Sequence, residues 1–106
     1  AILRDKEKCD YIICLSHLGY QYKDDKISDV KLAAQTEGID LILGGHTHTF
    51  LDAPVIYKNF ADKEVLINQV GWAGVWLGRV DIFFEKKRTK KWHSGKPVKV
   101  SKKTRE

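Results

Sequence analysis

The chain has 106 residues, enough for one domain with a modest core, which excludes a multidomain enzyme within these residues. Apolar residues make up 42% and charged residues 31%, as in soluble globular proteins, and no apolar run approaches the roughly 20 residues of a membrane span. The net charge is +5, but residues 86–105 carry ten Lys and Arg and no acid, whereas residues 1–85 carry nine bases and thirteen acids. The positive charge therefore belongs to the C-terminal segment.

Two apolar runs with a helical segment between them occupy the first half of the chain. "DYIICLSH" (10–17) is rich in β-branched and aromatic residues and predicts a buried strand. Residues 24–38 predict a helix, with Ser28 as its N-cap and Gly38 at its end. "IDLILGG" (39–45) predicts a second buried strand. Strand, helix and strand in this order indicate a βαβ unit with parallel strands.

The second half of the chain predicts strands of another kind. After a loop over residues 47–64, an apolar run predicts a third strand over 65–71. Residues 75–87 alternate between apolar and charged side chains, which is typical of a half-exposed antiparallel strand. A short strand near Trp92 and an edge strand over 97–101 complete the expected elements. The predicted fold class is α/β, a βαβ unit plus antiparallel strands.

Three histidines follow the two apolar strands. His17 ends the first run, and His46 and His48 come directly after the two glycines that end the second. When Asp10 and Asp40 are aligned as the openings of the two strands, all three histidines emerge at the carboxyl ends. Parallel strands in similar register end at the same edge of a sheet, and open α/β sheets bind ligands there. We therefore expect these histidines to lie close together.

Imidazole chemistry points to a metal at this edge, since neutral histidine is the commonest metal ligand in proteins. His46 and His48 are two residues apart in a segment expected to be extended, so both should point to the same side. Thr47 and Thr49 then point away and can anchor the loop by hydrogen bonds. The preceding glycines allow unusual dihedral angles and a close backbone approach. The alternative is that the histidines are structural.

A longer motif around these residues has a family resemblance. "LSHLG" followed by "D..LA....GIDLILGGHTHT" resembles the second half of the calcineurin-like metallophosphoesterases, most closely the 5′-nucleotidase branch, whose relatives include 2′,3′-cyclic phosphodiesterases. The similarity covers roughly residues 10–87. It implies half of a four-layer sandwich, two divalent metal ions (Zn, Mn, Fe or similar) and hydrolysis of phosphate esters of nucleotides. It also implies that His17 and His46 bind one metal ion and that His48 binds the other.

The family also uses D-x-H, G-D-x-x and G-N-H motifs, and none of them precedes His17 here. We therefore expect a fragment in which residues 1–87 are the C-terminal part of a catalytic domain and residues 88–106 a basic hairpin or tail. Such a chain should be inactive alone and bind metal weakly, and no catalytic residue is assigned within it. Asn68 is a weak candidate for substrate binding, and the resemblance suggests a periplasmic or cell-surface location.

Two further expectations concern partners. A sheet without the first half of its domain should leave one face or edge uncovered, which favours self-association or a mate supplied by another chain. The alternative function is a non-enzymatic α/β binding module whose basic tail, residues 86–105, binds polyanions while its histidines are structural.

Overall fold

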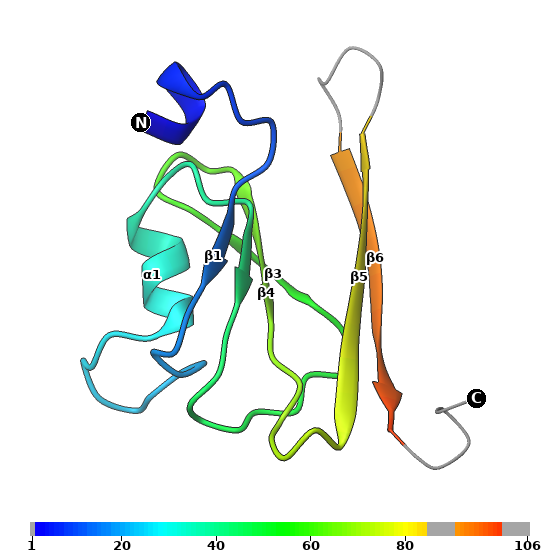
Figure 1. Cartoon of the computed structure of the whole chain (residues 1–106). Helices are drawn as coiled ribbons and strands as arrows, with labels where there is room; N and C mark the ends of the chain where they lie inside the picture. Colours follow the sequence, from blue (N-terminus) through cyan, green and yellow to red (C-terminus); the bar gives the residue numbers. More distant parts are fainter. Residues whose placement is uncertain (1, 85–90, 101–106) are drawn as a thin grey trace.

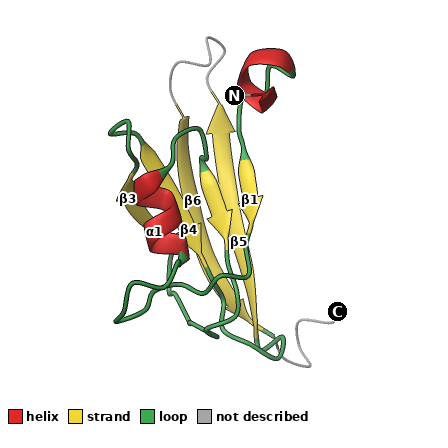
Figure 2. Ribbon diagram, turned by 90° about the vertical axis from the view of Figure 1, so that its left-hand side faces the viewer, coloured by secondary structure: helices red, strands yellow, loops and turns green. Residues whose placement is uncertain are grey.

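In the part of the chain that the computed structural model describes, one α-helix and two β-sheets form three layers (Figure 1). The structure describes residues 2–84 and 91–100, with only the backbone of residues 91–94. The elements are, in chain order, η1 (Ile2–Lys6), β1 (Ile13–Leu15), α1 (Asp29–Gln35), β2 (Leu41–Leu43), β3 (Val55–Lys58), β4 (Glu64–Asn68), β5 (Trp76–Phe84) and β6 (Lys91–Lys99). The first sheet has the order β1-β2-β4-β3, and β5 and β6 form the second. Helix α1 covers one face of the first sheet, and the β5–β6 pair lies on its other side (Figures 1 and 2).

The predicted βαβ unit is confirmed, because β1 and β2 pair in parallel. Each of these strands is only three residues long, shorter than the predicted runs 10–17 and 39–45. Helix α1 begins where the N-cap signal placed it, since the hydroxyl of Ser28 accepts a hydrogen bond from the amide of Lys31 at 3.2 Å. It ends at Gln35, before the predicted stop at Gly38.

Of the strands in the second half, the one predicted over 75–87 has the antiparallel pairing that its pattern indicated. Strand β4 is parallel to β2, and β5 is antiparallel to β6 over their whole lengths. Strand β3, antiparallel to β4, lies within the segment 47–64 that was predicted to be a loop, so that prediction is wrong there. Residues 91–99 form one continuous strand instead of two short ones. The predicted boundary between residues 87 and 88 lies outside the described residues and stays a prediction.

The core lies between α1 and the first sheet. Ala33 of α1 packs on Ile42, Val65 and Ile67, and all four side chains are buried. Alternation along the strands sends the other side chains, such as Ile13, Leu41 and Leu43, toward the second sheet, where they line a cavity of about 440 Å³ together with residues of β5. The ends of β5 are held by edge-to-face aromatic contacts, Trp76 with Phe50 and Phe84 with Tyr11.

Strand β1 forms one edge of the first sheet. Within the described residues it pairs only with β2, and its side chains Ile13 and Leu15 are 51% and 81% exposed. An edge of this kind agrees with the expectation that part of the sheet is left uncovered. Among the described residues, no helix is both long enough and apolar enough to cross a lipid bilayer.

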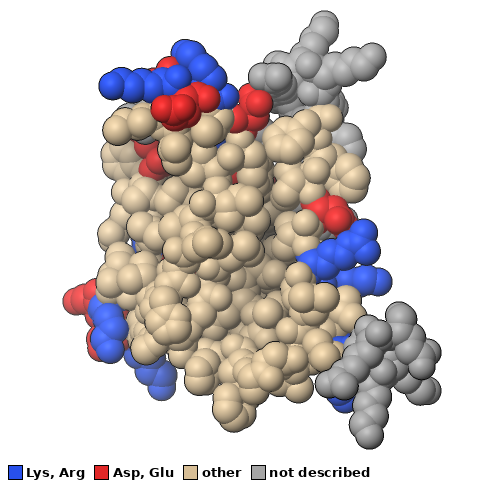
Figure 3. All heavy atoms as spheres, viewed as in Figure 1, with Lys and Arg blue, Asp and Glu red and all other residues tan. Residues whose placement is uncertain are grey.

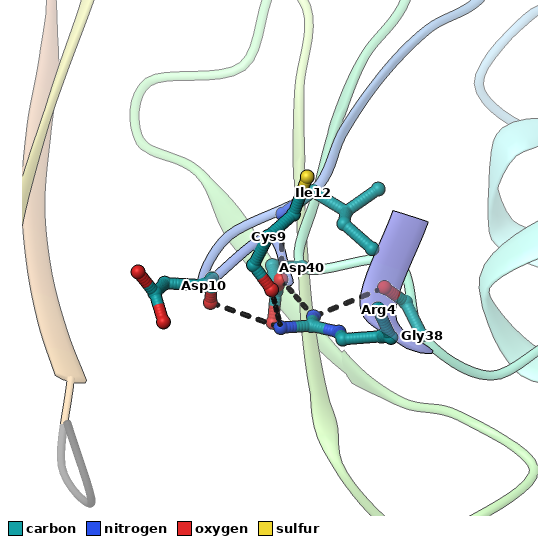
Figure 4. Close-up of polar contacts among 6 residues, drawn as sticks. All are labelled: Arg4, Cys9, Asp10, Ile12, Gly38 and Asp40. Atoms are coloured by element: carbon teal, nitrogen blue, oxygen red, sulfur yellow. Dashed lines mark hydrogen bonds and ion pairs between the residues drawn. The ribbon is translucent and has the colours of Figure 1, made fainter. Parts of the chain in front are cut away.

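An arginine at the start of the chain ties the N-terminal segment to this sheet (Figure 4). The guanidinium of Arg4 donates to the carbonyls of Cys9 at 3.2 Å, Asp10 at 2.9 Å and Gly38 at 3.1 Å, and it forms an ion pair with Asp40. Helix η1, which the sequence did not predict, carries this arginine. The guanidinium therefore joins the segment before β1 to the segment before β2.

Asp40 also sets the register of the first two strands. Its carboxylate accepts a hydrogen bond from the amide of Ile12 at 2.8 Å, and Ile13 stands opposite Leu41. Asp40 is thus opposite Ile12, two residues from the predicted alignment with Asp10, and that alignment is wrong. A shift of two residues leaves every side chain on the same face of the sheet, so the strand ends still meet at one edge.

Candidate metal centre

Two of the three histidines meet at the carboxyl edge of the parallel strands. His17 follows β1, His46 follows β2, and both side chains are exposed. The Nδ1 atom of His46 lies 3.3 Å from the Nε2 atom of His17, and the ring centroids are 5.0 Å apart with the planes at 65°. The structure therefore brings these two imidazoles together, as the parallel βαβ arrangement predicted.

The third histidine lies apart from this pair. The ring of His48 stacks on Trp72 in the β4–β5 connection, with centroids 5.6 Å apart and planes within 15°. The expectation that His46 and His48 share a side of an extended segment is wrong, because both have left-handed backbones, with φ of 77° and 54°. Trp72 was missed by the sequence reasoning, since nothing in its local pattern pairs it with a loop more than twenty residues away.

The two glycines before the histidines provide space. A Cβ on Gly44 would lie 2.0 Å from the Oδ2 atom of Asp29, and one on Gly45 would lie 3.3 Å from the Nδ1 atom of His17. The predicted close backbone approach is therefore present. The predicted unusual dihedral angles are not found at these glycines, since neither has a positive φ; they occur at the two histidines instead.

Asp29 is a buried carboxyl group beneath the histidine loops, and sequence reasoning placed it only in the first turn of the helix. Its side chain is fully buried, and its Oδ1 atom accepts a hydrogen bond from the hydroxyl of Ser16 at 2.5 Å. Its Oδ2 atom is buried without a hydrogen-bond partner. Burial raises the pKa of this carboxyl, and the hydrogen bond from Ser16 opposes that shift. Asp29 therefore holds Ser16, the residue directly before His17, by a hydrogen bond.

The His17–His46 pair fits two positions around one metal ion. Two nitrogens at the usual Zn–N distance of about 2.0–2.1 Å and a tetrahedral angle are about 3.3–3.4 Å apart, which is the separation found between Nε2 and Nδ1. A long hydrogen bond between one protonated and one unprotonated ring nitrogen would give the same separation. In the part of the chain that the structure describes, no three His, Cys, Asp or Glu side chains are placed to hold an ion.

The loop that carries His46 and His48 is held by the two threonines, as predicted. The hydroxyls of Thr47 and Thr49 lie 2.9 Å apart, and the Thr47 hydroxyl accepts a hydrogen bond from the amide of Tyr20 at 2.9 Å. Tyr20 lies in the loop after His17, so this bond joins the two histidine loops.

Asn68, the predicted substrate contact, ends strand β4 and is only 7% exposed. Its Nδ2 atom faces Gly78 of β5, at 3.2 Å from where a Cβ on that residue would lie. Its role in substrate binding stays a prediction.

Comparison with known proteins places this arrangement in a family. Residues 1–50, which contain all three histidines, match the calcineurin-like phosphoesterase family. The chain is 38% identical to the trifunctional nucleotide phosphoesterase protein YfkN of Bacillus subtilis (strain 168) over 85 residues, 80% of this chain and 5% of that protein. It is 28% identical to a snake venom 5′-nucleotidase of Gloydius brevicauda over 104 residues, 86% of this chain and 17% of that protein.

A solved structure extends the likeness to the fold. The crystal structure of a 5′-nucleotidase precursor from Thermus thermophilus matches with a TM-score of 0.75 and 28% identity, over 89% of this chain and 20% of that one. This likeness confirms the predicted α/β class. The chain spans a fifth or less of each of these three proteins. From the histidine motif, the parallel strands that present it and these matches, we conclude that the chain belongs to the calcineurin-like phosphoesterase family, with 5′-nucleotidases among its relatives.

Proposed function

We propose that residues 1–87 are the C-terminal part of the catalytic domain of a metal-dependent phosphoesterase, 5′-nucleotidase-like, which hydrolyses phosphate esters of nucleotides. One observation carries the proposal: the ring nitrogens of His17 and His46 meet at 3.3 Å at the edge where parallel strands present ligands. The relatives named phosphoesterase and 5′-nucleotidase support the reaction class.

The residues of this chain have distinct roles in that proposal. His17 and His46 bind one divalent ion and His48 binds the other. For this, the ring of His48 either separates from the ring of Trp72 or moves together with it. When bound, two such ions would supply the polarisation of a phosphate ester and the activation of water. Because imidazole is neutral, carboxylates are needed to balance the charge of two ions, and we propose that other residues of a longer protein supply them.

The substrate and the location follow from the same relatives. A nucleotide is the proposed substrate, with Asn68 a candidate contact that needs a local opening between β4 and β5 to reach it. A venom enzyme and a protein called a precursor are among the relatives, and they support a site of action at the cell surface or in the periplasm.

The uncovered edge of β1 supports a partner for this sheet. The side of the molecule on which β1 lies is nearly free of Lys, Arg, Asp and Glu in its middle (Figure 3), and Leu15 there is 81% exposed. We propose that further strands of the catalytic domain, or a second copy of the chain, cover this edge. Sedimentation tests this: we expect the 106-residue chain to associate with rising concentration, and a monomer at all concentrations would contradict the proposal.

Titration with Zn²⁺ or Mn²⁺, followed by calorimetry, tests the metal site. We expect weak binding by the 106-residue chain that is lost in His17→Ala and in His46→Ala. The fourth histidine offers a matched control, because His93→Ala should leave the affinity unchanged. Binding that survives the loss of both His17 and His46 would refute the proposed site.

Hydrolysis of a chromogenic phosphoester with Mn²⁺ tests the need for carboxylates. We expect no metal-dependent turnover by residues 1–106 alone, because three imidazoles cannot balance two divalent charges. Clear turnover that disappears in His46→Ala would show that the described histidines suffice, and it would refute the proposed division of ligands.

Polyanion binding by residues 86–105 is the alternative, and half of that segment lies outside the described residues. Binding to nucleic acid that weakens steeply with salt and disappears when residues 86–106 are removed would favour it.

A further inference from the structure

The side-chain amide of Gln69 lies beneath the loop that carries His46 and His48. Gln69 follows strand β4 and is only 3% exposed. Its Oε1 atom accepts hydrogen bonds from the amide of Thr49 at 2.6 Å and from the hydroxyl of Thr47 at 3.3 Å. Its Nε2 atom donates to the carbonyl of Gly45 at 3.3 Å. One buried side chain therefore contacts the residues before, between and after the two histidines.

These contacts matter because the loop is strained. His46 and His48 both have left-handed backbones, with φ of 77° and 54°, which a residue with a Cβ adopts at a cost in free energy. A loop of this kind persists only where its surroundings over-determine it. The hydrogen bonds of Gln69 fall on alternate residues, 45, 47 and 49, and so they enclose both strained positions.

The same network reaches the other histidine loop. The Thr47 hydroxyl donates to Gln69 and accepts from the amide of Tyr20 at 2.9 Å. Tyr20 is three residues after His17, in the loop that follows β1. The amide of Gln69 thus acts through Thr47 on both loops, and the distance between His17 and His46 depends on both.

We propose that Gln69 is the positioning residue of the metal centre: its amide holds the His46 loop in the strained conformation that places the His46 ring beside His17. The inference rests on the proposed function for its purpose, but its geometry can be tested without any metal. Gln69 touches neither the metal nor a substrate in this proposal, and it acts only through the loop backbone and Thr47.

The test uses the 106-residue chain and two matched variants. Gln69→Met removes the amide and keeps the length of the side chain. Asn59→Leu is the control, because Asn59 is also buried and its Oδ1 atom also accepts two loop hydrogen bonds, from Ala61 at 2.8 Å and Lys63 at 2.9 Å, but in the β3–β4 turn. Both variants lose buried hydrogen bonds, and only one of them loses contact with the histidine loop.

The first measurement is made without metal, by nuclear magnetic resonance. In Gln69→Met we expect the through-space contact between the His17 and His46 rings to disappear. We also expect the hydrogen of the Thr49 amide to exchange with solvent at least about tenfold faster, which corresponds to a decrease of about 1.4 kcal/mol in the free energy of local opening. Asn59→Leu should keep the ring contact and the protection of Thr49. If Gln69→Met keeps both as well, the inference is refuted.

The second measurement is Zn²⁺ affinity. Loss of a residue that orients a metal ligand typically weakens binding about 10–100-fold, and we expect a loss of this size in Gln69→Met with no change in Asn59→Leu. If the original chain binds no Zn²⁺ through His17 and His46 while the ring contact still depends on Gln69, the proposed metal site fails and the positioning role stands.

A second variant guards against misfolding. Should Gln69→Met fail to fold, Thr47→Val removes the hydroxyl that joins the two loops and keeps the shape of the side chain. We expect it to weaken the contact between His17 and His46 and leave the Asn59 turn intact. An unchanged ring contact in Thr47→Val would overturn the proposed route from Gln69 to the first loop.

Discussion

Replacement of Gly44 by alanine should destabilise the fold far more than replacement of its neighbour. Gly44 does not have a positive φ, so alanine meets no backbone strain there. Its Cβ, however, would lie 2.0 Å from the Oδ2 atom and 3.1 Å from the Cγ atom of Asp29. Real Cβ atoms essentially never come within 2.0 Å of such an oxygen, so the Asp29 carboxyl or the β2 backbone has to move.

The size of the effect follows from how Asp29 is held. Its side chain is fully buried, and its Oδ1 atom is bonded to the hydroxyl of Ser16. Displacing the carboxyl breaks a hydrogen bond to a charged or polar buried group, which costs about 1.5–3 kcal/mol. Overpacking adds about 1–3 kcal/mol. We therefore expect Gly44→Ala to lower the free energy of unfolding by about 2.5–6 kcal/mol.

Urea unfolding followed by far-ultraviolet circular dichroism measures this difference. Gly45→Ala is the matched control: its Cβ would lie 3.3 Å from an exposed imidazole, His17, which can give way. Gly45→Ala should lower the free energy of unfolding by less than about 1 kcal/mol. Equal costs for Gly44→Ala and Gly45→Ala would refute the reasoning.

A double-mutant cycle identifies the cause. In an Asp29→Ala background the clashing carboxyl is gone, so Gly44→Ala should cost much less than it does alone. A cost that stays the same in that background would mean that the backbone of β2, and not Asp29, requires glycine.

Three further predictions concern strain, protonation and the N-terminal segment. His48→Gly should be about 1 kcal/mol more stable than His48→Ala in urea, because glycine adopts the φ of 54° without the Cβ penalty; equal stabilities would contradict the strain. Burial raises the pKa of Asp29, so its contribution to stability is complete below the unfolded-state pKa of about 3.9 and is lost as the pH rises through the folded-state pKa. Asp29→Asn should remove that part of the stability–pH curve, and an unchanged curve would show that Asp29 does not cause it. Arg4→Met should lower the free energy of unfolding, measured by thermal unfolding, by about 1–2 kcal/mol, because Arg4 joins Asp40 and three carbonyls. Arg79→Met should lower it by less than about 0.5 kcal/mol, because the ion pair of Arg79 with Asp81 is exposed. Equal losses in these two variants would contradict the role of Arg4.

Local patterns predicted the elements that carry the site. The apolar runs around Ile13 and Leu41 and the N-cap at Ser28 were sufficient for a parallel βαβ unit. Strand β3 was missed because its outward side chain Ile56 is apolar, which hides the alternation that marks a half-exposed strand, and because Pro54 directly precedes it. The short ladder of β1 was also not foreseen, and the prediction that the run 10–17 is a buried strand is wrong, because none of its residues is buried in the structure.

Long-range contacts decided the register. The sequence offers two aspartates at similar places, and Asp10 looked like the equivalent of Asp40. In the structure, Asp40 binds the amide of Ile12, and Arg4 pairs with Asp40, so the register depends on groups up to 36 residues apart. Such pairs leave no periodic signal in the chain.

The sequence by itself determined that His17 and His46 emerge at one edge of the sheet, because apolar strands joined by one helix pair in parallel and end together. Only the tertiary structure decided where the imidazoles point. The His46 ring lies beside His17 and the His48 ring lies on Trp72, because both histidines have a left-handed backbone. The residues on either side of them are hydrogen-bonded to the side chain of Gln69, which is more than twenty residues away in the chain. A dihedral angle held by such distant contacts cannot be read from the residues that adopt it.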